Sequence, residues 1–301
     1  MVALPAPAAI PARTAQVTRA CSPPLHGPCY RRCMSESEWF ALNRTAWNAR
    51  TGVHLASKFY DVDAFRAGAS SLKPIELEQV GDVRDKTLLH LQCHFGQDTL
   101  SWARRGARVT GLDLSDEAVR AARALAQDLS LDARFVEANV YDAPAALGGE
   151  TFDIVFTSYG VLGWLPDMGR WARAAAACLK PGGVLHVIEF HPAVWMFDDA
   201  FERIAYAYDG HGEPLITEET GTYADRDAPV KLREVGFNHG IGTVVTALLE
   251  AGLTLERLRE LDWSPYDIFP DMEEGPPGQF RMKKFGRRLP LVYALAARQG
   301  R

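Results

Sequence analysis

The chain has 301 residues, of which 47% are hydrophobic and 24% are charged, and its formal net charge at pH 7 is −5. This length suffices for one large α/β domain with an insertion or for two modest domains. An acidic chain without a basic block of five or six residues is not typical of nucleic-acid-binding proteins, so we expect no nucleic-acid partner. No apolar run approaches the roughly 20 residues that a membrane helix needs, so we also expect no membrane partner.

Residues 1–33 are rich in Ala, Pro and Arg without helical or strand periodicity, which predicts a disordered N-terminal extension. Met34 directly precedes the first amphipathic run, so a translation start at Met34 instead of Met1 is a hypothesis. The five cysteines show no pairing framework, and we expect reduced thiols, no metal site and a cytoplasmic location. The spacing of Cys21, His26, Cys29 and Cys33 would permit zinc binding, but the surrounding low-complexity sequence disfavours it.

Residues 34–84 are predicted to form an N-terminal helical cap. The pattern favours a helix over residues 36–50, with Ser35 or Ser37 as N-cap, and a second helical stretch to about residue 80 that Pro74 interrupts. The cap is unusually aromatic, with two tryptophans in the helix and a Phe59–Tyr60 pair after it. These rings either pack the helix onto the core or cover a ligand cleft, and Tyr60 is a candidate lid residue.

From residue 85 onward, short apolar strands alternate with helices. The predicted strands are residues 87–91, 107–112, 133–137, 152–157 and 184–189, and the predicted helices are residues 97–105, 116–128 and 168–179. Lys180 to Gly183 reads as a turn, because proline fixes one φ angle and glycine permits positive φ. Strands alternating with helices predict a Rossmann-like, parallel, doubly wound sheet with helices on both faces.

The alternation stops after the fifth strand. Residues 190–236 are rich in aromatic and acidic residues, a helix is predicted over 240–251, and strands are predicted over 254–262 and 289–297. The last two strands lack a helix between them, which predicts an antiparallel last strand in a sheet of seven. We interpret residues 190–236 as a substrate lid over an apolar pocket or as a dimerisation arm, so both a monomer and a homodimer are open. The lid candidates here are Trp195 and Phe197, with His239 beyond.

The loop after the first strand predicts the ligand. A dinucleotide-binding loop reads G-x-G-x-x-G, because a pyrophosphate must approach bare backbone at the helix N-terminus. Here Gln92 and His94 occupy two glycine positions and only Gly96 remains. Bulky side chains at these positions argue against a pyrophosphate and therefore against a nicotinamide-dependent dehydrogenase.

The next two strand ends predict a nucleoside. Asp113 ends the second strand, where a carboxylate can accept both hydroxyls of a ribose. Asn139 follows the third strand, where an amide can bind an adenine edge, and Val140 offers an apolar contact. Tyr159, after the fourth strand, borders the same cleft. Ribose and adenine without phosphates describe S-adenosylmethionine.

Five blocks now carry a resemblance to a known family: LLHLQCHFGQDT (88–99), VTGLDLS (109–115), FVEANVYDA (135–143), FDIVFTSYGVLGWLPD (152–167) and LKPGGVLHVIEFHP (179–192). In order and spacing, over about residues 35–298, the chain resembles a class I S-adenosylmethionine-dependent methyltransferase of the small-molecule type, and its HFGQDT loop is similar to that of a bacterial subgroup. His90 stands where the family usually has an acidic residue. The resemblance implies a methyltransferase domain over residues 85–301 with residues 190–236 as lid. The implied cofactor-binding residues are Gln92, His94, Gly96, Gln97, Asp98, Asp113, Leu114, Asn139, Val140 and Tyr159, with Gln97 or Asp98 for the ammonium group.

The resemblance also implies the chemistry. Methyl transfer is an in-line displacement in which the cofactor carries the reactive group, so the protein mainly positions a small-molecule acceptor and needs a base only when the nucleophile must lose a proton. His191, directly beyond the predicted fifth strand, is the best-placed candidate base. The alternative is a non-catalytic S-adenosylmethionine-binding or partner protein of the same fold.

Overall fold

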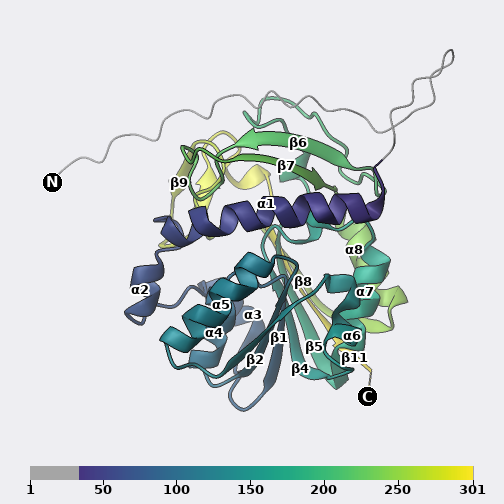
Figure 1. Ribbon diagram of the computed structural model, residues 1–301. Helices are drawn as coiled ribbons and strands as arrows, with labels where there is room; N and C mark the ends of the chain where they lie inside the picture. The colour runs from purple at the N-terminus through teal and green to yellow at the C-terminus, as the bar shows by residue number, and fades with distance from the viewer. Residues whose placement is uncertain (1–33, 301) are drawn as a thin grey trace.

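The computed structural model describes residues 34–300, so the predicted extension over residues 1–33 lies outside the described part of the chain. A seven-stranded sheet has the order β3-β2-β1-β4-β5-β11-β8 (Figure 1). Its strands are β1 (Thr87–Leu91), β2 (Arg108–Asp113), β3 (Ala133–Glu137), β4 (Phe152–Ser158), β5 (Leu179–Phe190), β8 (Leu253–Leu261) and β11 (Val292–Gln299). β1 to β5 pair in parallel, and β11 is antiparallel to both β5 and β8. The predicted mostly parallel sheet with an antiparallel last strand is confirmed.

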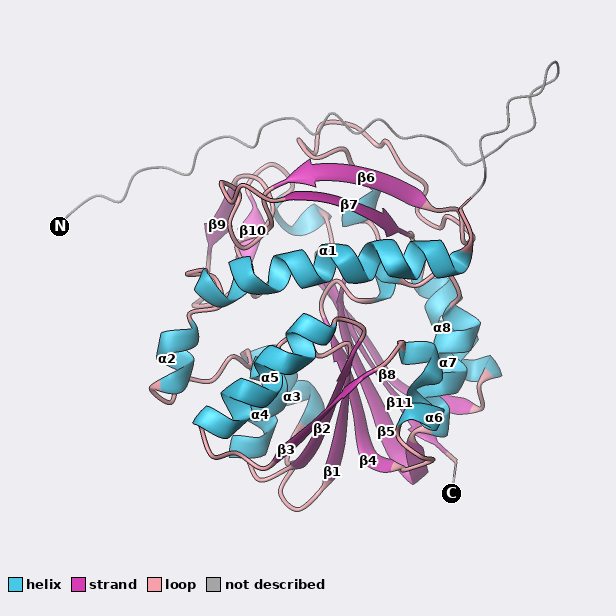
Figure 2. Cartoon of the chain, in the orientation of Figure 1, coloured by secondary structure: helices cyan, strands magenta, loops and turns pink. Residues whose placement is uncertain are grey.

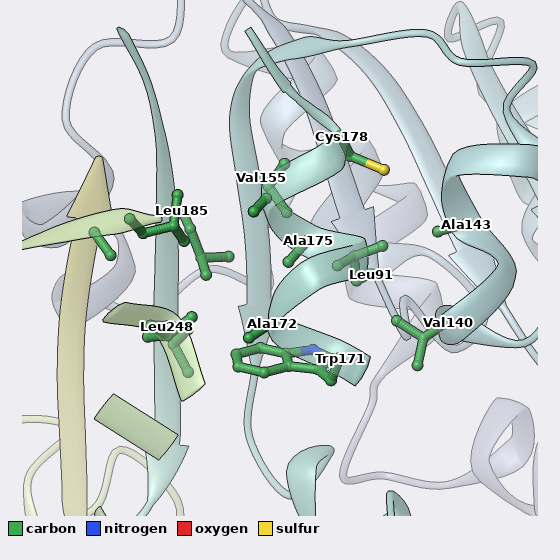
Figure 3. Packing of buried hydrophobic residues seen from close by; sticks show 14 of the residues in the cluster. Leu91, Val140, Ala143, Val155, Trp171, Ala172, Ala175, Cys178, Leu185 and Leu248 are labelled. Atoms are coloured by element: carbon green, nitrogen blue, oxygen red, sulfur yellow. The ribbon is translucent and has the colours of Figure 1, made fainter. Parts of the chain in front are cut away.

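Helices cover both faces of the sheet (Figure 2). They include α3 (Pro74–Val80), α4 (Gln97–Arg104), α5 (Asp116–Asp128), α6 (Ala143–Ala146), α7 (Met168–Ala177) and α8 (Ile241–Glu250). Successive strand residues point to opposite faces, so Leu88 packs in the cluster with Trp102 of α4, whereas Leu89 packs in the cluster with Trp171 of α7. Figure 3 shows the second of these clusters, where Trp171 lies among small side chains of its own helix and apolar residues of the strands.

Two expectations about local structure are wrong. Lys180 to Gly183 is not a separate turn, because β5 begins at Leu179 and passes through these residues with a register shift against β4. Glycine is needed there for close approach, since a Cβ on Gly183 would lie 2.9 Å from the Phe152 carbonyl oxygen. Pro74 does not interrupt a helix but begins α3, at the first-turn position where its missing N–H costs nothing.

A cap lies over the carboxyl ends of the central strands (Figure 1). It consists of α1 (Glu36–Ala56), α2 (Val62–Arg66) and the antiparallel hairpin of β6 (Leu215–Thr220) and β7 (Lys231–Gly236). Ser35 caps α1 as predicted, but the helix continues six residues beyond the predicted end at residue 50. The side chain of Asn43 exchanges two 2.9 Å hydrogen bonds with the backbone of Val235, which fixes α1 against β7.

A second, small hairpin separates β8 from β11. It is formed by β9 (Met272–Glu274) and β10 (Phe280–Met282). Over residues 34–300, no helix is both long enough and apolar enough to cross a membrane.

Candidate functional site

The loop from β1 to α4 has an unusual backbone. Gln92, His94 and Gly96 adopt positive φ angles of 56°, 50° and 80°, so every second residue is left-handed. Such angles favour glycine, and a non-glycine residue there costs roughly 1 kcal/mol. The loop therefore keeps the shape of a glycine loop although two of the three residues carry side chains. Those side chains have partners: Gln92 Nε2 donates to the Val161 carbonyl oxygen at 2.9 Å, and His94 Nε2 lies 2.9 Å from His54 Nδ1.

Gly96 is the position in this loop where a side chain does not fit. It is the N-cap of α4, and a Cβ there would lie 2.6 Å from the Phe135 ring and 3.1 Å from Ala122. The loop consequently brings its backbone close to α5 and β3, and the N-terminus of α4 opens toward the end of β2.

Asp113 joins this loop to the end of β2. Its Oδ2 accepts the backbone N–H of His94 at 2.7 Å, and its Oδ1 accepts that of Ser115 at 2.9 Å. Burial raises the pKa of Asp113 to about 6, against the opposing effect of these hydrogen bonds. A carboxylate has about four acceptor positions, so acceptor capacity remains for a ligand hydroxyl such as that of a ribose.

The end of β3 supplies the next two side chains. The Asn139 side-chain oxygen accepts the Tyr141 N–H at 3.0 Å and so begins a short 3-10 helix, η1 (Val140–Asp142). Val140, 3% exposed, packs directly behind it. The side-chain oxygen of Asn139 is thus engaged, and its amide NH2 group can donate hydrogen bonds to a ligand.

All ten predicted cofactor-contact residues line one cavity of about 1400 Å³. Its wall also contains Tyr60, Trp195 and His239 from the predicted lid set. The structure thus brings together residues from four strand ends, the N-terminal cap and the insert.

Two predicted residues are not brought to this cavity. His191 Nε2 bonds Glu260 at 2.7 Å and its Nδ1 accepts the Ala193 N–H at 3.0 Å, because its own backbone N–H pairs with Leu291 and turns it toward β8. Phe197 stacks on Phe201 with 5.3 Å between ring centroids and packs in the core beneath. Neither is among the described residues that line the cavity.

Glu189 at the end of β5 is a lining residue, but its carboxylate is engaged. It accepts the backbone N–H groups of Val161 at 2.8 Å, Leu162 at 3.1 Å and Gly160. Burial raises its pKa while these bonds lower it. Glu189 therefore shapes the loop after β4 and is not a free base.

Gln97 and Asp98 begin α4 and line the same cavity. Gln97 Nε2 donates to the Tyr60 carbonyl oxygen at 3.0 Å, so its amide is used to hold the cap. Asp98 lines the cavity, and burial raises its pKa against the effects of Ser71, Lys73 and Ser158. Of the two predicted ammonium-binding side chains, Asp98 has the better position and charge.

Sequence reasoning missed Glu76. It is fully buried, and burial, followed by the neighbouring Asp98, raises its pKa to about 8. It lies beside the Tyr159 hydroxyl, which is itself buried. No sequence pattern marks Glu76, because it reads as an ordinary first-turn acid of α3.

Sequence reasoning also missed Arg50 and His54. The Arg50 guanidinium is 3% exposed, lies 5.1 Å from the Trp47 ring and 5.5 Å from that of Trp164, and binds Glu219 at 2.9 Å and also Glu234. Positions 43, 47, 50 and 54 share one face of a helix. Extending the predicted helix from residue 50 to Ala56 would have placed His54 on the same face as Arg50.

The comparisons agree with this geometry. A family model described as a methyltransferase domain matches residues 89–185. A ubiquinone biosynthesis O-methyltransferase of Xanthomonas euvesicatoria is 34% identical over 215 residues, which cover 70% of this chain and 82% of that protein. The chain belongs to the S-adenosylmethionine-dependent methyltransferase family. The predicted family and its cofactor, S-adenosylmethionine, are confirmed.

Another curated relative matches over less of its length. A protein of the same name from Serratia proteamaculans is 31% identical over 133 residues, 43% of this chain, and the chain spans about half, 54%, of that relative. Among solved structures, an S-adenosylmethionine-dependent methyltransferase from Mesorhizobium loti has a TM-score of 0.54 at 22% identity, over 78% of this chain and 100% of the other. One from Methanosarcina mazei has a TM-score of 0.53 at 20% identity, over 76% and 98%. These structural similarities show the fold.

Proposed function

We propose that this protein transfers the methyl group of S-adenosylmethionine to a small-molecule acceptor. The observation that carries the proposal is the single cavity that holds every predicted cofactor-contact residue together with aromatic side chains of the cap. Its volume of about 1400 Å³ exceeds the roughly 300–1,000 Å³ of an ordinary ligand pocket, which leaves room for a second molecule beside a cofactor.

The residues present fit the cofactor. Asp113 would bind the ribose hydroxyls, Asn139 and Val140 the adenine, and Asp98 the ammonium group, each from the strand or helix end described above. Bound S-adenosylmethionine supplies an electrophilic methyl group. The chain contributes orientation of the acceptor and exclusion of water, which are the main protein contributions to such a displacement.

The acceptor end of the cavity is aromatic. The rings that line it beyond the cofactor-contact set include Phe59, Phe190, Trp195, Tyr223, Tyr266 and Phe269. We infer an acceptor with a largely apolar, flat body, because aromatic walls bind such surfaces in preference to strongly hydrated ones.

We further propose a hydroxyl oxygen as the methyl-accepting atom, as the name O-methyltransferase of the relatives suggests. His239 then replaces His191 as candidate base. It lines the cavity, and its Nε2 lies 2.7 Å from the Leu165 carbonyl oxygen, which requires the proton on Nε2 and leaves the Nδ1 lone pair to accept the acceptor's proton. Burial lowers its pKa, so the ring is neutral near pH 7.

Calorimetric titration with S-adenosylhomocysteine tests the cofactor site. We expect binding by the native chain and a loss of at least about 30-fold in affinity in Asp113→Ala, because two ribose hydroxyls lose a charged partner. Asp153→Asn is the matched control, since Asp153 pairs with Lys180 at 2.9 Å and does not line the cavity. Absence of binding, or equal affinity in Asp113→Ala, would contradict the proposal.

Transfer is tested with S-adenosylmethionine labelled on the methyl group and a panel of phenols and catechols. Label in the acceptor, reduced about 100-fold in His239→Phe but with S-adenosylhomocysteine affinity kept, is the expected result. Cofactor binding without transfer to any acceptor would favour the non-catalytic alternative.

A further inference from the structure

His54 lies in the last turn of α1, outside the residues that match the family model, yet it reaches the cofactor loop. Its side chain is 0% exposed, and its Nδ1 lies 2.9 Å from Nε2 of His94, 40 residues further along the chain. The contact therefore joins the cap to the one loop whose shape defines the cofactor site.

The hydrogen bond between the two imidazoles joins two neutral rings, each with one N–H. Burial lowers the pKa of His54 to about 3, with a smaller contribution from Arg50, and burial also lowers the pKa of His94. Both rings are therefore neutral near pH 7, and one ring nitrogen donates to the other. The charged groups beside the pair include Arg50 on the same helix, which binds Glu219 on β6 and Glu234 on β7, and Asp113, whose carboxylate accepts the His94 backbone N–H.

Aromatic rings enclose the pair and fix its geometry. The Tyr60 ring stacks on His54 with 5.1 Å between centroids, and the Tyr223 ring lies 4.8 Å away on the insert side. The Tyr60 and Tyr223 hydroxyls bond each other, which closes the enclosure between the N-terminal cap and the insert. Trp47 lies edge-on to His94 at 5.1 Å.

His94 occupies a position that favours glycine. Its φ of 50° is left-handed, and its backbone N–H binds the Asp113 carboxylate. A side chain at such a position is unfavourable by an amount comparable to the net contribution of one buried hydrogen bond. The bond to His54 offsets that cost. It also links the Asp113 carboxylate to the cap, because His94 contacts Asp113 through its backbone and His54 through its side chain.

From this arrangement we propose that His54 is a positioning residue for the cofactor. It holds His94, and with it the loop from Gln92 to Gly96, against α1, so that cofactor binding is coupled to the seating of α1, β6 and β7. This inference rests on the proposed cofactor binding. It assigns to the cap a part in binding the cofactor, in addition to covering the acceptor.

The test uses the full chain, S-adenosylhomocysteine as probe, calorimetry and hydrogen–deuterium exchange. In the native protein we expect the probe to slow exchange in residues 47–60 and 215–236. His54→Phe keeps an aromatic ring but loses the hydrogen bond, so we expect about fivefold weaker binding, the equivalent of one hydrogen bond, and loss of the probe-induced protection of the cap.

Two further variants separate positioning from simple destabilisation. His54→Asn places an amide near the Nδ1 position and should restore affinity to within about twofold and restore the cap protection. His94→Gly removes the partner, so His54→Phe should have no further effect on affinity in that background, as a double-mutant cycle requires for a direct pair. His186→Phe, a change at a buried histidine outside the cavity, is the control and should leave the coupling intact.

The outcomes are distinguishable. If the native chain does not bind the probe, the proposed function and this inference fail together. If it binds, and His54→Phe keeps both native affinity and native cap protection, or if the two histidine changes are additive, the inference alone is overturned.

Discussion

The cofactor side and the cap side of the cavity are held together by different kinds of contacts. On the cofactor side, Asp113 binds Ser115 and Asn139 binds Tyr141, each across two residues of sequence. On the cap side, Asn43 binds Val235 across 192 residues, Arg50 binds Glu234 across 184 and Tyr60 binds Tyr223 across 163. The cofactor side thus relies largely on local turns and strand ends, whereas these contacts of the cap join segments far apart in the sequence.

The difference predicts how each half responds to mutation. A change on the cofactor side should disturb a rigid, locally determined backbone and therefore the whole domain. A change on the cap side should release the cap and leave the sheet folded, because contacts of long sequence separation join elements that are otherwise independent.

Gly96→Ala should have the largest effect, about 2–4 kcal/mol of unfolding free energy, from overpacking together with a left-handed φ. The new Cβ would lie 2.6 Å from the Phe135 ring. Urea denaturation measures the loss. Gly148→Ala is the matched control, since Gly148 also has a positive φ of 65° but no atom within 4 Å, and it should lose only about 1 kcal/mol. Equal losses would show that backbone angle alone matters at Gly96.

Arg50→Met should destabilise the cap by about 3 kcal/mol, because the buried carboxylate of Glu234 and the partly buried carboxylate of Glu219 lose their guanidinium. Exchange in β6 and β7 should accelerate while that in β1 to β5 stays native. The partly exposed Arg170, which binds Glu36 at 2.6 Å, provides the comparison: Arg170→Met should change stability by less than about 1 kcal/mol. Faster exchange throughout the sheet would mean that the two halves are not separable.

Glu76 should make stability depend on pH. Its folded pKa of about 8 lies above the 4.5 that is ordinary for a glutamate, so the folded state holds the proton more tightly and stability falls as pH rises from 4.5 to 8. Glu76→Gln removes this dependence. Between pH 5 and 7 the native chain should lose about 2 kcal/mol relative to the variant, since each unit of pKa shift corresponds to about 1.4 kcal/mol. Parallel stability curves for the two proteins would contradict the raised pKa.

Gln92→Gly should have the smallest effect. Glycine relieves the left-handed φ of 56° but loses the 2.9 Å bond to Val161, and the two contributions of roughly 1 kcal/mol oppose each other. We expect a net change within about 0.5 kcal/mol in urea denaturation and native affinity for S-adenosylhomocysteine. A loss of affinity would show that the Gln92 side chain itself contributes to the cofactor site.

The sequence predicts the cofactor side well because its determinants are local. The predicted strands over 87–91 and 133–137 and the predicted helix over 116–128 coincide with β1, β3 and α5. An apolar strand, a turn and a capped helix are each specified by a few neighbouring residues. The left-handed backbone at Gln92 and His94 is less obvious, because it depends on partners in Val161 and His54.

The cap side is not predictable in the same way. His191 directly follows β5, but its direction is set by pairing with Leu291 on the approach to β11, a hundred residues later. Phe197 and Trp195 are equally aromatic in sequence, and only tertiary packing places the second at the cavity and the first in the core. The roles of Arg50 and His54 depend on the hairpin of β6 and β7, which no local pattern in residues 190–236 predicts.

The Phe135 ring has a consequence for how related chains can vary. A Cβ on Gly96 would lie 2.6 Å from this ring, and one on Gly111 would lie 2.7 Å from the ring and 2.7 Å from Cys93 Sγ. Substitutions at these positions should therefore be correlated. Smaller side chains at positions 135 and 93 would be expected alongside alanine at position 111, whose backbone is not left-handed, whereas position 96 would still favour glycine because of its φ of 80°.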